Sequence, residues 1–206
     1  MTILWDWNGT LLDDTAACIG ALNAMLVRRN LKPVTMEYYR REFSFPVKYF
    51  YEKLGVRLED EDWDALAQEY HDVYHSLRYA LNPEAIPALE LAKSAGARQA
   101  VISAMKQDVL DRDTEPFGVR RYMDYVYGTS NLYGGTKTDR ARELMAMLGD
   151  DDGYVLIGDS LHDWEVARDI GARAVLFSGG GHSAERLSAV APTFPSLLEC
   201  VGNALS

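Results

Sequence analysis

Several features are scarce in this chain of 206 residues, and each scarcity excludes a class of protein. The two cysteines, Cys18 and Cys200, stand near opposite ends of the chain, which is typical of unpaired thiols in a reducing compartment and not of a disulfide framework. No apolar run approaches the roughly 20 residues of a membrane span, and the N-terminus lacks the basic and apolar regions of a signal peptide. We therefore expect a soluble cytoplasmic protein without a membrane partner.

Positive charge is also scarce. The chain has 21 Lys and Arg against 31 Asp and Glu, which gives a net charge of -10. This balance argues against a long basic surface, so we expect no nucleic-acid partner. An acidic protein that binds an anionic substrate needs a local positive field, which a metal ion and a few placed cations can supply.

Short apolar runs bounded by turn residues predict five buried strands, at 3–5, 99–102, 125–127, 154–157 and 174–177. Helical periodicity fills most of the intervals, for example 87–94, 137–148 and 162–170. Strands that alternate with helices indicate a doubly wound, Rossmann-like α/β fold with a parallel five-stranded sheet.

The interval between the first two strands is longer than a crossover helix needs, at more than 90 residues. Residues 15–81 have a helical, aromatic-rich pattern with no convincing strand, and Asn82-Pro83 marks the return to the core. We therefore expect a catalytic core made of residues 1–14 and 82–206, with a helical cap inserted at 15–81. One core plus an insertion also suits the chain length.

Charge within the expected cap is uneven. Residues 28–57 hold eight Lys or Arg against three Glu, whereas residues 59–72 carry seven acids and no Lys or Arg. We interpret the two stretches as solvated helix faces. The alternative is that the basic half faces an anionic ligand, and its candidates are Arg40, Arg41 and Lys48.

Polar residues follow the expected strands where each strand ends. They are Asp6 in DWNGTL, Ser103 in VISAM, and Asp159 and Asp163 in GDSLHD, while Lys137 follows the turn GGT and begins a helix. Ligands of open parallel sheets bind at the carboxyl ends of the strands, near the point where the strand order reverses. We therefore expect these side chains to meet at one edge of the sheet.

Three acids, one hydroxyl and one lysine suit phosphoryl transfer. Carboxylates that share a site repel one another unless a cation is bound, and oxygen ligands without a Cys or His cluster favour Mg²⁺ over zinc. A carboxylate can attack phosphorus to form an aspartyl-phosphate, which water then cleaves. Lysine and hydroxyl groups neutralise the phosphoryl oxygens during transfer. The residues therefore predict a magnesium-dependent enzyme that acts on phosphate esters.

At these residues the sequence resembles the haloacid dehalogenase superfamily, and within it the capped phosphatases of the phosphoglycolate phosphatase type. Four motifs match in order, namely DWNGT at 6–10, Ser103 after a hydrophobic strand, Lys137 before a helix, and GDSLHD at 158–163. The resemblance spans essentially the whole core, while the cap matches in position and helical character only. It implies hydrolysis of a small phosphorylated metabolite through an aspartyl-phosphate intermediate.

The resemblance also assigns roles. It makes Asp6 the nucleophile and a metal ligand, and Asp159 the second metal ligand. Asp163 would bind the metal through water or orient Lys137, and the backbone carbonyl of Asn8 would complete the Mg²⁺ site. The candidates for binding the phosphorylated substrate are Thr10, Ser103, Ala104 and Lys137, with Arg40 and Lys48 from the cap.

Asn8 is a departure from the family pattern. Capped phosphatases usually have aspartate two residues after the nucleophile, where it protonates the leaving group and then activates water. The amide of Asn8 cannot donate and recover a proton, and general acid–base catalysis typically contributes about 10²–10⁴-fold. We therefore expect aryl and acyl phosphates to be cleaved faster than alkyl phosphates, with His162, the cap or the substrate itself as a candidate for activating water. The alternative is a pseudoenzyme of the same fold that binds phosphate ligands without turnover.

Two further signals are interpreted as structural. The run SGGGHS at 178–183 resembles a glycine-rich phosphate loop, but it lacks the GK[ST] ending, so we expect a flexible connection. Of the two tryptophans beside the nucleophile, we expect Trp5 in the core and Trp7 at the mouth of the pocket.

Overall fold

The computed structural model describes residues 1–129, 137–149 and 153–206, so the turn expected at 134–136 lies outside the described residues. Its main sheet has six parallel strands in the order β5-β4-β1-β6-β7-β8. The strands are β1 (Thr2–Trp5), β4 (Arg98–Lys106), β5 (Tyr125–Thr129), β6 (Tyr154–Gly158), β7 (Arg173–Phe177) and β8 (Thr193–Phe194). The five expected strands are all present, and β8 adds a sixth at one edge. From β1 the chain adds β4 and β5 on one side, and then β6, β7 and β8 on the other side. This is the doubly wound, Rossmann-like arrangement, and the strand order reverses beside the central strand β1.

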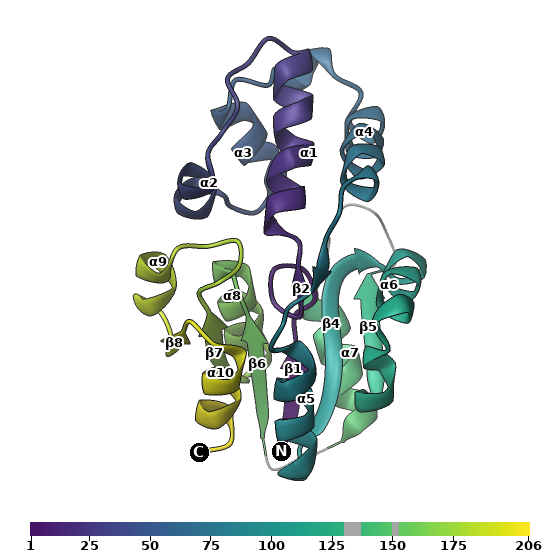
Figure 1. The fold of residues 1–206 in the computed structure, drawn as a ribbon, viewed down its shortest axis with the longest axis vertical. Helices are drawn as coiled ribbons and strands as arrows, with labels where there is room; N and C mark the ends of the chain where they lie inside the picture. Colours follow the sequence, from purple (N-terminus) through teal and green to yellow (C-terminus); the bar gives the residue numbers. More distant parts are fainter. Residues whose placement is uncertain (130–136, 150–152) are drawn as a thin grey trace.

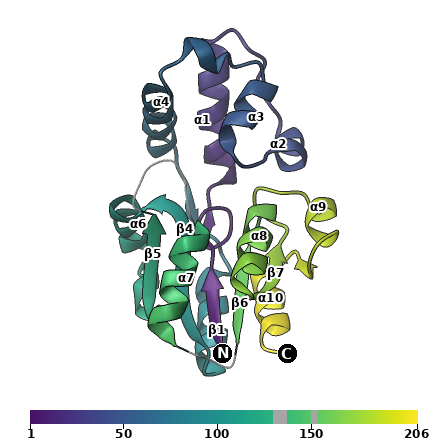
Figure 2. The same ribbon diagram turned by 180° about the vertical axis from the view of Figure 1, so that it is seen from behind.

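Alternate residues of β1 face opposite sides of the sheet. Ile3 and Trp5 belong to one apolar cluster and Leu4 to another, as the two-residue period of a strand requires. The face that carries Ile3 and Trp5 is covered by α5 (Ala85–Ser94) and α10 (Leu197–Ala204), which lie in front in Figure 1. The face that carries Leu4 is covered by α7 (Lys137–Leu148) and α8 (Leu161–Ile170), which lie in front in Figure 2. The remaining core helices are α6 (Gln107–Thr114), α9 (Ala184–Ser188) and the 3₁₀ turns η2 (Glu115–Phe117) and η3 (Val119–Tyr122).

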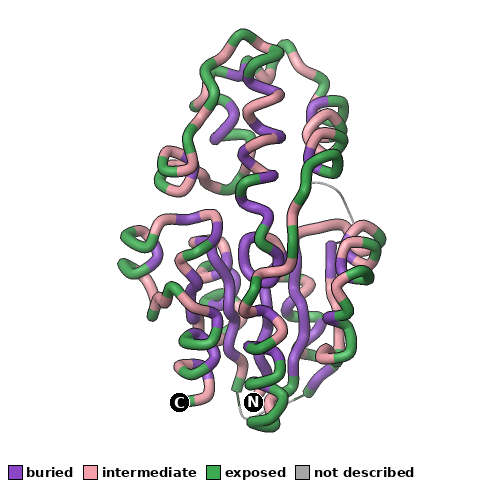
Figure 3. Tube along the Cα trace, viewed as in Figure 1, coloured by how far each residue is buried: buried purple, intermediate pink, exposed green. Residues whose placement is uncertain are grey.

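The cap, by which we mean residues 15–81, lies above the carboxyl ends of the strands (Figure 1). It contains α1 (Thr15–Arg28), α2 (Met36–Glu42), α3 (Val47–Lys53), η1 (Leu58–Asp60) and α4 (Trp63–Ser76). These helices enclose an apolar cluster of their own, which includes Leu22, Phe50 and Leu66. Figure 3 shows the result along the trace, since the central strand β1 is buried along its whole length while the cap helices alternate between buried and exposed turns.

A two-stranded antiparallel pair joins core and cap. It consists of β2 (Leu12–Asp13) and β3 (Ala80–Leu81), with Leu12 opposite Leu81. The sequence pattern missed β3, because two residues are too few to show a strand period. The chain therefore enters and leaves the cap at the same place, directly above the end of β1.

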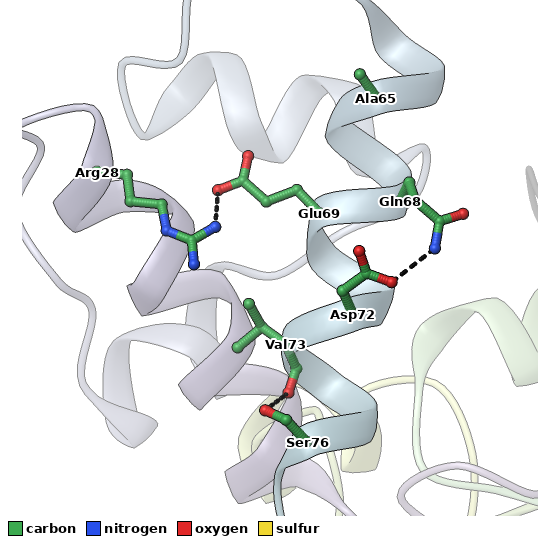
Figure 4. Close-up of a pocket in the computed structure, with 7 residues that line it drawn as sticks. All are labelled: Arg28, Ala65, Gln68, Glu69, Asp72, Val73 and Ser76. Carbon is green, nitrogen blue, oxygen red and sulfur yellow. Dashed lines mark hydrogen bonds and ion pairs between the residues drawn. The ribbon is translucent and has the colours of Figure 1, made fainter.

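Part of the basic half of the cap pairs with the acidic half. Arg28 and Arg29 both bind Glu69 at 2.8 Å, and Arg29 also binds Glu61 at 2.7 Å. The first of these pairs lies in a surface hollow between α1 and α4 (Figure 4), where the carboxylate of Asp72 accepts a hydrogen bond from Gln68. These contacts agree with solvated, mutually paired helix faces. Among the described residues, no helix has the length and apolar composition of a membrane span.

Candidate active site

Three carboxylates meet where β1 and β6 end. The backbone N–H of Asp6 donates to the carbonyl of Ile157 at 2.8 Å, so the chain leaves β1 beside the end of β6. The next carboxylates along β6 and α8 are Asp159 and Asp163. Oxygens of Asp6, Asp159 and Asp163 lie within 4.8 Å of one another, and all three residues are buried. The structure therefore brings together the three acids that the sequence placed at strand ends.

Lys137 joins two of these acids. It begins α7, which packs on the sheet through Ala141 and Leu144, and its Nζ donates to Oδ1 of both Asp6 and Asp163. The lysine side chain is only 2% exposed. Burial opposes its charge, but the two carboxylates outweigh burial and raise the pKa of Lys137. The ammonium group therefore stays charged over the physiological range.

Asp163 serves α8 as well as Lys137. Its Oδ2 accepts hydrogen bonds from the backbone N–H of Ser160 at 3.0 Å and from the Ser160 hydroxyl at 2.6 Å, which completes a capping box at the start of the helix. Burial alone would raise the pKa of Asp163, but the adjacent Lys137 lowers it below its usual value. Asp163 is therefore ionised and fixed in place.

The remaining charge at the site is negative. Three carboxylates against one lysine would leave two uncompensated charges if all were ionised. Burial raises the pKa of Asp6 to about 7, although Lys137 lowers it in part. Burial and the nearby charges of Asp6 and Asp163 raise the pKa of Asp159 well above its usual value. Such a site needs either protons or a cation, and its oxygen-only donors suit a divalent metal of the Mg²⁺ type.

Thr10 and the glycine-rich segment support these carboxylates. The Thr10 hydroxyl lies 3.2 Å from Oδ1 of Asp159 and 3.4 Å from Oδ2 of Asp6. The backbone N–H of Gly181 donates to Oδ2 of Asp159. At Gly180, a Cβ atom would collide with the Asp159 carboxylate and with the Gly9 carbonyl. The sequence interpretation of 178–183 as a flexible connection missed these contacts, because they join residues far apart in the chain, 22 positions for Gly181 and Asp159.

The Asn8 side chain is held by two residues that sequence reasoning did not identify. Its Nδ2 donates to Oδ2 of Asp14 at 2.7 Å and lies 3.3 Å from the Tyr74 hydroxyl of α4. That hydroxyl donates to the same Asp14 oxygen at 2.7 Å, and the Gly9 N–H donates to Oδ1 at 2.7 Å. Asp14 is 1% exposed, and burial raises its pKa. An acid eight residues after Asp6 shows no local pattern that would have revealed this cluster.

A cavity of about 910 Å³ lies between the cap and the acids. Its floor contains Asp6, Asn8, Ser103, Ala104, Lys137, Asp159 and Asp163, and the cap supplies most of its walls, including Lys48. The Ser103 hydroxyl accepts a hydrogen bond from the Met105 N–H at 3.1 Å. His162 is also a wall residue, and burial lowers its pKa. Seven of the residues proposed from the sequence as catalytic, metal-binding or substrate-binding thus border one cavity floor.

Three other residues lie away from this cavity. Thr10 is buried beneath the acids. The Arg40 guanidinium donates to the carbonyls of Gly179 and Gly180, at 2.6 and 2.8 Å. The expected position of Trp7 at the pocket mouth was wrong, because its ring is fully buried and donates to Asp113 at 2.7 Å.

Comparison with known proteins agrees with this geometry. The family model of haloacid dehalogenase-like hydrolases matches residues 3–177. The chain belongs to this family. The match takes in the described acids Asp6, Asp159 and Asp163, the lysine between them and the whole cap. As a haloacid dehalogenase-like hydrolase, this protein is an enzyme.

The alignments with individual relatives cover most of this hydrolase chain. A phosphoglycolate phosphatase of Caulobacter vibrioides is 29% identical over 189 residues, which cover 87% of this chain and 79% of the relative. Among solved structures, a predicted phosphatase from Clostridium acetobutylicum superimposes with a TM-score of 0.78 at 20% identity, covering 99% of this chain and 97% of the other. Protein tyrosine kinase A of Mycobacterium tuberculosis gives a TM-score of 0.79 at 20% identity, covering 100% and 97%. At this identity the two structures establish the shared fold.

Proposed function

We propose that this haloacid dehalogenase-like hydrolase is a Mg²⁺-dependent phosphatase of small phosphorylated molecules, with Asp6 as its nucleophile. The observation that carries the proposal is the buried ion pair of Asp6 with Lys137, at the edge of a group of three carboxylates. The name of the Caulobacter vibrioides relative supports the choice of a phosphate ester as the substrate. The unpaired thiols of Cys18 and Cys200 support a reducing compartment, and we propose the cytoplasm.

The residues present would hold the metal at Asp6, Asp159 and Asp163, with the Asn8 carbonyl as a further oxygen ligand. When bound, Mg²⁺ supplies positive charge for the phosphoryl oxygens and for the acids. Lys137 lowers the pKa of Asp6 against the effect of burial, which favours the carboxylate form that attacks phosphorus. The bond from phosphorus to the leaving oxygen then breaks, and that oxygen takes a proton from water. A second water cleaves the aspartyl-phosphate, which releases phosphate and restores Asp6.

Asn8 limits the first of these steps. Its amide is fixed by Asp14 and Tyr74, and it has no acidic proton for the leaving oxygen. The leaving group must therefore depart as an anion, which favours esters of acidic alcohols and phenols. Because Asn8 supplies no proton, it also supports a second candidate function, which is to bind phosphate ligands without turnover.

Acid-quenched mass spectrometry separates the two functions. We expect Mg²⁺ and p-nitrophenyl phosphate to give steady phosphate release, and a peptide containing Asp6 to carry the mass of one phosphoryl group. Asp6→Asn is the control, and it should abolish both signals while the protein stays folded. Ligand binding without release or labelling would support the binding protein and refute the phosphatase.

A further inference from the structure

Half of the cap residues that line the cavity are aromatic. They include Tyr39, Phe43, Phe45, Phe50, Trp63 and Tyr70, all from the cap. The volume of about 910 Å³ is near the upper end of the roughly 300–1,000 Å³ that small-molecule sites occupy. A phosphoryl group on the floor fills a small part of this space. The rest of the substrate must therefore lie against aromatic rings.

The described wall residues provide little positive charge for a second anionic group. Lys137 is paired with two acids, and Lys106 is paired with Asp108 at 3.1 Å. The ammonium of Lys48 lies 4.4 Å from the centre of the Trp63 ring, where a cation–π contact holds it. Arginine is absent from the described cavity lining.

The cap histidine on the same walls does not change this balance. Burial lowers the pKa of His71, so that its ring is neutral near pH 7. The walls also carry acidic groups, since Asp14 and Glu165 both border the cavity. Among the described wall residues, a carboxylate on the leaving group would therefore meet mainly rings and acids, with Lys48 on the Trp63 ring as the one lysine that no acid pairs.

We infer that the substrate is an aryl phosphate, the monoester of a phenol that carries no further ionised group. The inference rests on the proposed phosphatase function. Two independent observations carry it, because the aromatic walls select the ring and Asn8 selects an oxygen that can depart as an anion. Attack by Asp6 forms its bond to phosphorus and breaks the bond to the phenol oxygen, which keeps the electron pair and then takes a proton from water.

Recognition of the ring is tested with esters whose leaving alcohols have comparable basicity. With Mg²⁺ present, we expect kcat/KM for benzyl phosphate to exceed that for glycerol phosphate and for phosphoglycolate by at least about tenfold, because the ring buries apolar area. Phenyl phosphate should exceed benzyl phosphate by more than about tenfold, since phenoxide departs without an acid. A preference for phosphoglycolate, or equal rates for the phenyl and benzyl esters, would overturn the assignment.

A variant of a cavity-wall residue, compared with a matched control, tests whether the ring of the substrate binds in this cavity. Trp63→Ala should reduce the preference for benzyl over glycerol phosphate at least about threefold, because part of the ring contact is lost. Tyr49→Ala removes an aromatic ring from α3 that is 66% exposed and does not line the cavity. It should leave the preference unchanged. Equal effects of the two substitutions would contradict ring binding in this cavity.

Binding measurements keep the test independent of turnover. In calorimetric titrations with Mg²⁺, benzylphosphonate should bind the protein at least about tenfold more tightly than phosphonoacetate, which carries a carboxylate in place of the ring. If this holds while no ester is hydrolysed, the proposed phosphatase function fails and selection of the ring stands. If esters are hydrolysed but phosphonoacetate binds as tightly, the phosphatase stands and the aryl assignment is overturned.

Discussion

Replacing Asn8 by aspartate would put a carboxylate where an amide nitrogen now donates to Asp14 at 2.7 Å. Asp14 is buried and already accepts hydrogen bonds from Tyr74 and Gly9. Two carboxylates at this distance cannot both be ionised, so the pair must share one proton. The two residues then titrate as a unit, with one pKa raised well above that of an isolated aspartate.

The stability of the variant should depend on pH. A raised pKa in the folded state means that the folded protein binds more protons than the unfolded chain, so stability falls as pH rises from the unfolded to the folded pKa. We expect Asn8→Asp to lower the free energy of unfolding by about 1–3 kcal/mol at pH 8, the cost of an unsatisfied buried group. Most of this loss should be absent at pH 5.

Activity should change in the opposite direction. The shared proton is the general acid that the wild-type chain lacks, so turnover of benzyl phosphate should rise by about 10²-fold, the lower end of what acid–base catalysis supplies. Phenyl phosphate should gain less, because phenoxide needs no proton to depart. The ratio of phenyl to benzyl ester cleavage should therefore fall.

The matched control is the exchanged pair, Asn8→Asp with Asp14→Asn, which restores one amide and one carboxylate. It should recover the stability at pH 8 and lose most of the gain in activity, because a single carboxylate beside an amide shares no proton. Thermal unfolding at pH 5 and pH 8, together with steady-state kinetics on both esters, gives all the values. Mass spectrometry must show that Asn8 has not deamidated, since asparagine before glycine is prone to this reaction. An unchanged pH profile of stability and unchanged benzyl phosphate turnover would refute the reasoning.

Three further predictions concern the charged site. Mg²⁺ should raise the melting temperature more at pH 8 than at pH 5, because Asp6, with a pKa of about 7, holds a proton at pH 5 that the cation must displace; thermal melts that show equal shifts would contradict this. Arg40→Ala should lower the free energy of unfolding by about 1–2 kcal/mol, because two carbonyls of the glycine-rich segment lose their donor; urea denaturation measures the change, and no change would contradict the contact. Gly180→Ala should weaken Mg²⁺ binding at least about tenfold by displacing Asp159; calorimetry tests this against Gly202→Ala, where a Cβ meets nothing within 4 Å.

The sequence was sufficient to predict the central part of the fold. The run that ends at Trp5 is buried, the run that ends at Ile157 is buried from Val155 onward, and the two lie side by side, so the acids after them had to meet. A parallel sheet brings the carboxyl ends of its strands to one edge, and this rule needs no knowledge of side-chain packing. The same reasoning could not find β3 or β8, because each has only two residues.

Contacts set by packing could not be predicted. Trp7 follows the strand by two residues, but its ring is oriented by Phe117 at 6.1 Å and by Asp113, which is 106 positions away. The contact between Asn8 and Tyr74 joins residues 66 positions apart. In both cases the partner is chosen by the way the helices pack on the sheet, and a single sequence carries no local record of that choice.

The antiparallel pair of β2 and β3 has a consequence for how this hydrolase can change. Leu12 and Leu81 are direct partners, so the ends of the intervening segment are only about 5 Å apart. Another helical module with closely spaced ends can be grafted at this junction without altering the path of the sheet, provided that it supplies a hydroxyl to Asp14 as Tyr74 does. The acids at the strand ends and the aromatic rings of the cap are therefore encoded in separable stretches of the chain, and recombination at two points would be enough to exchange the rings while preserving the acids.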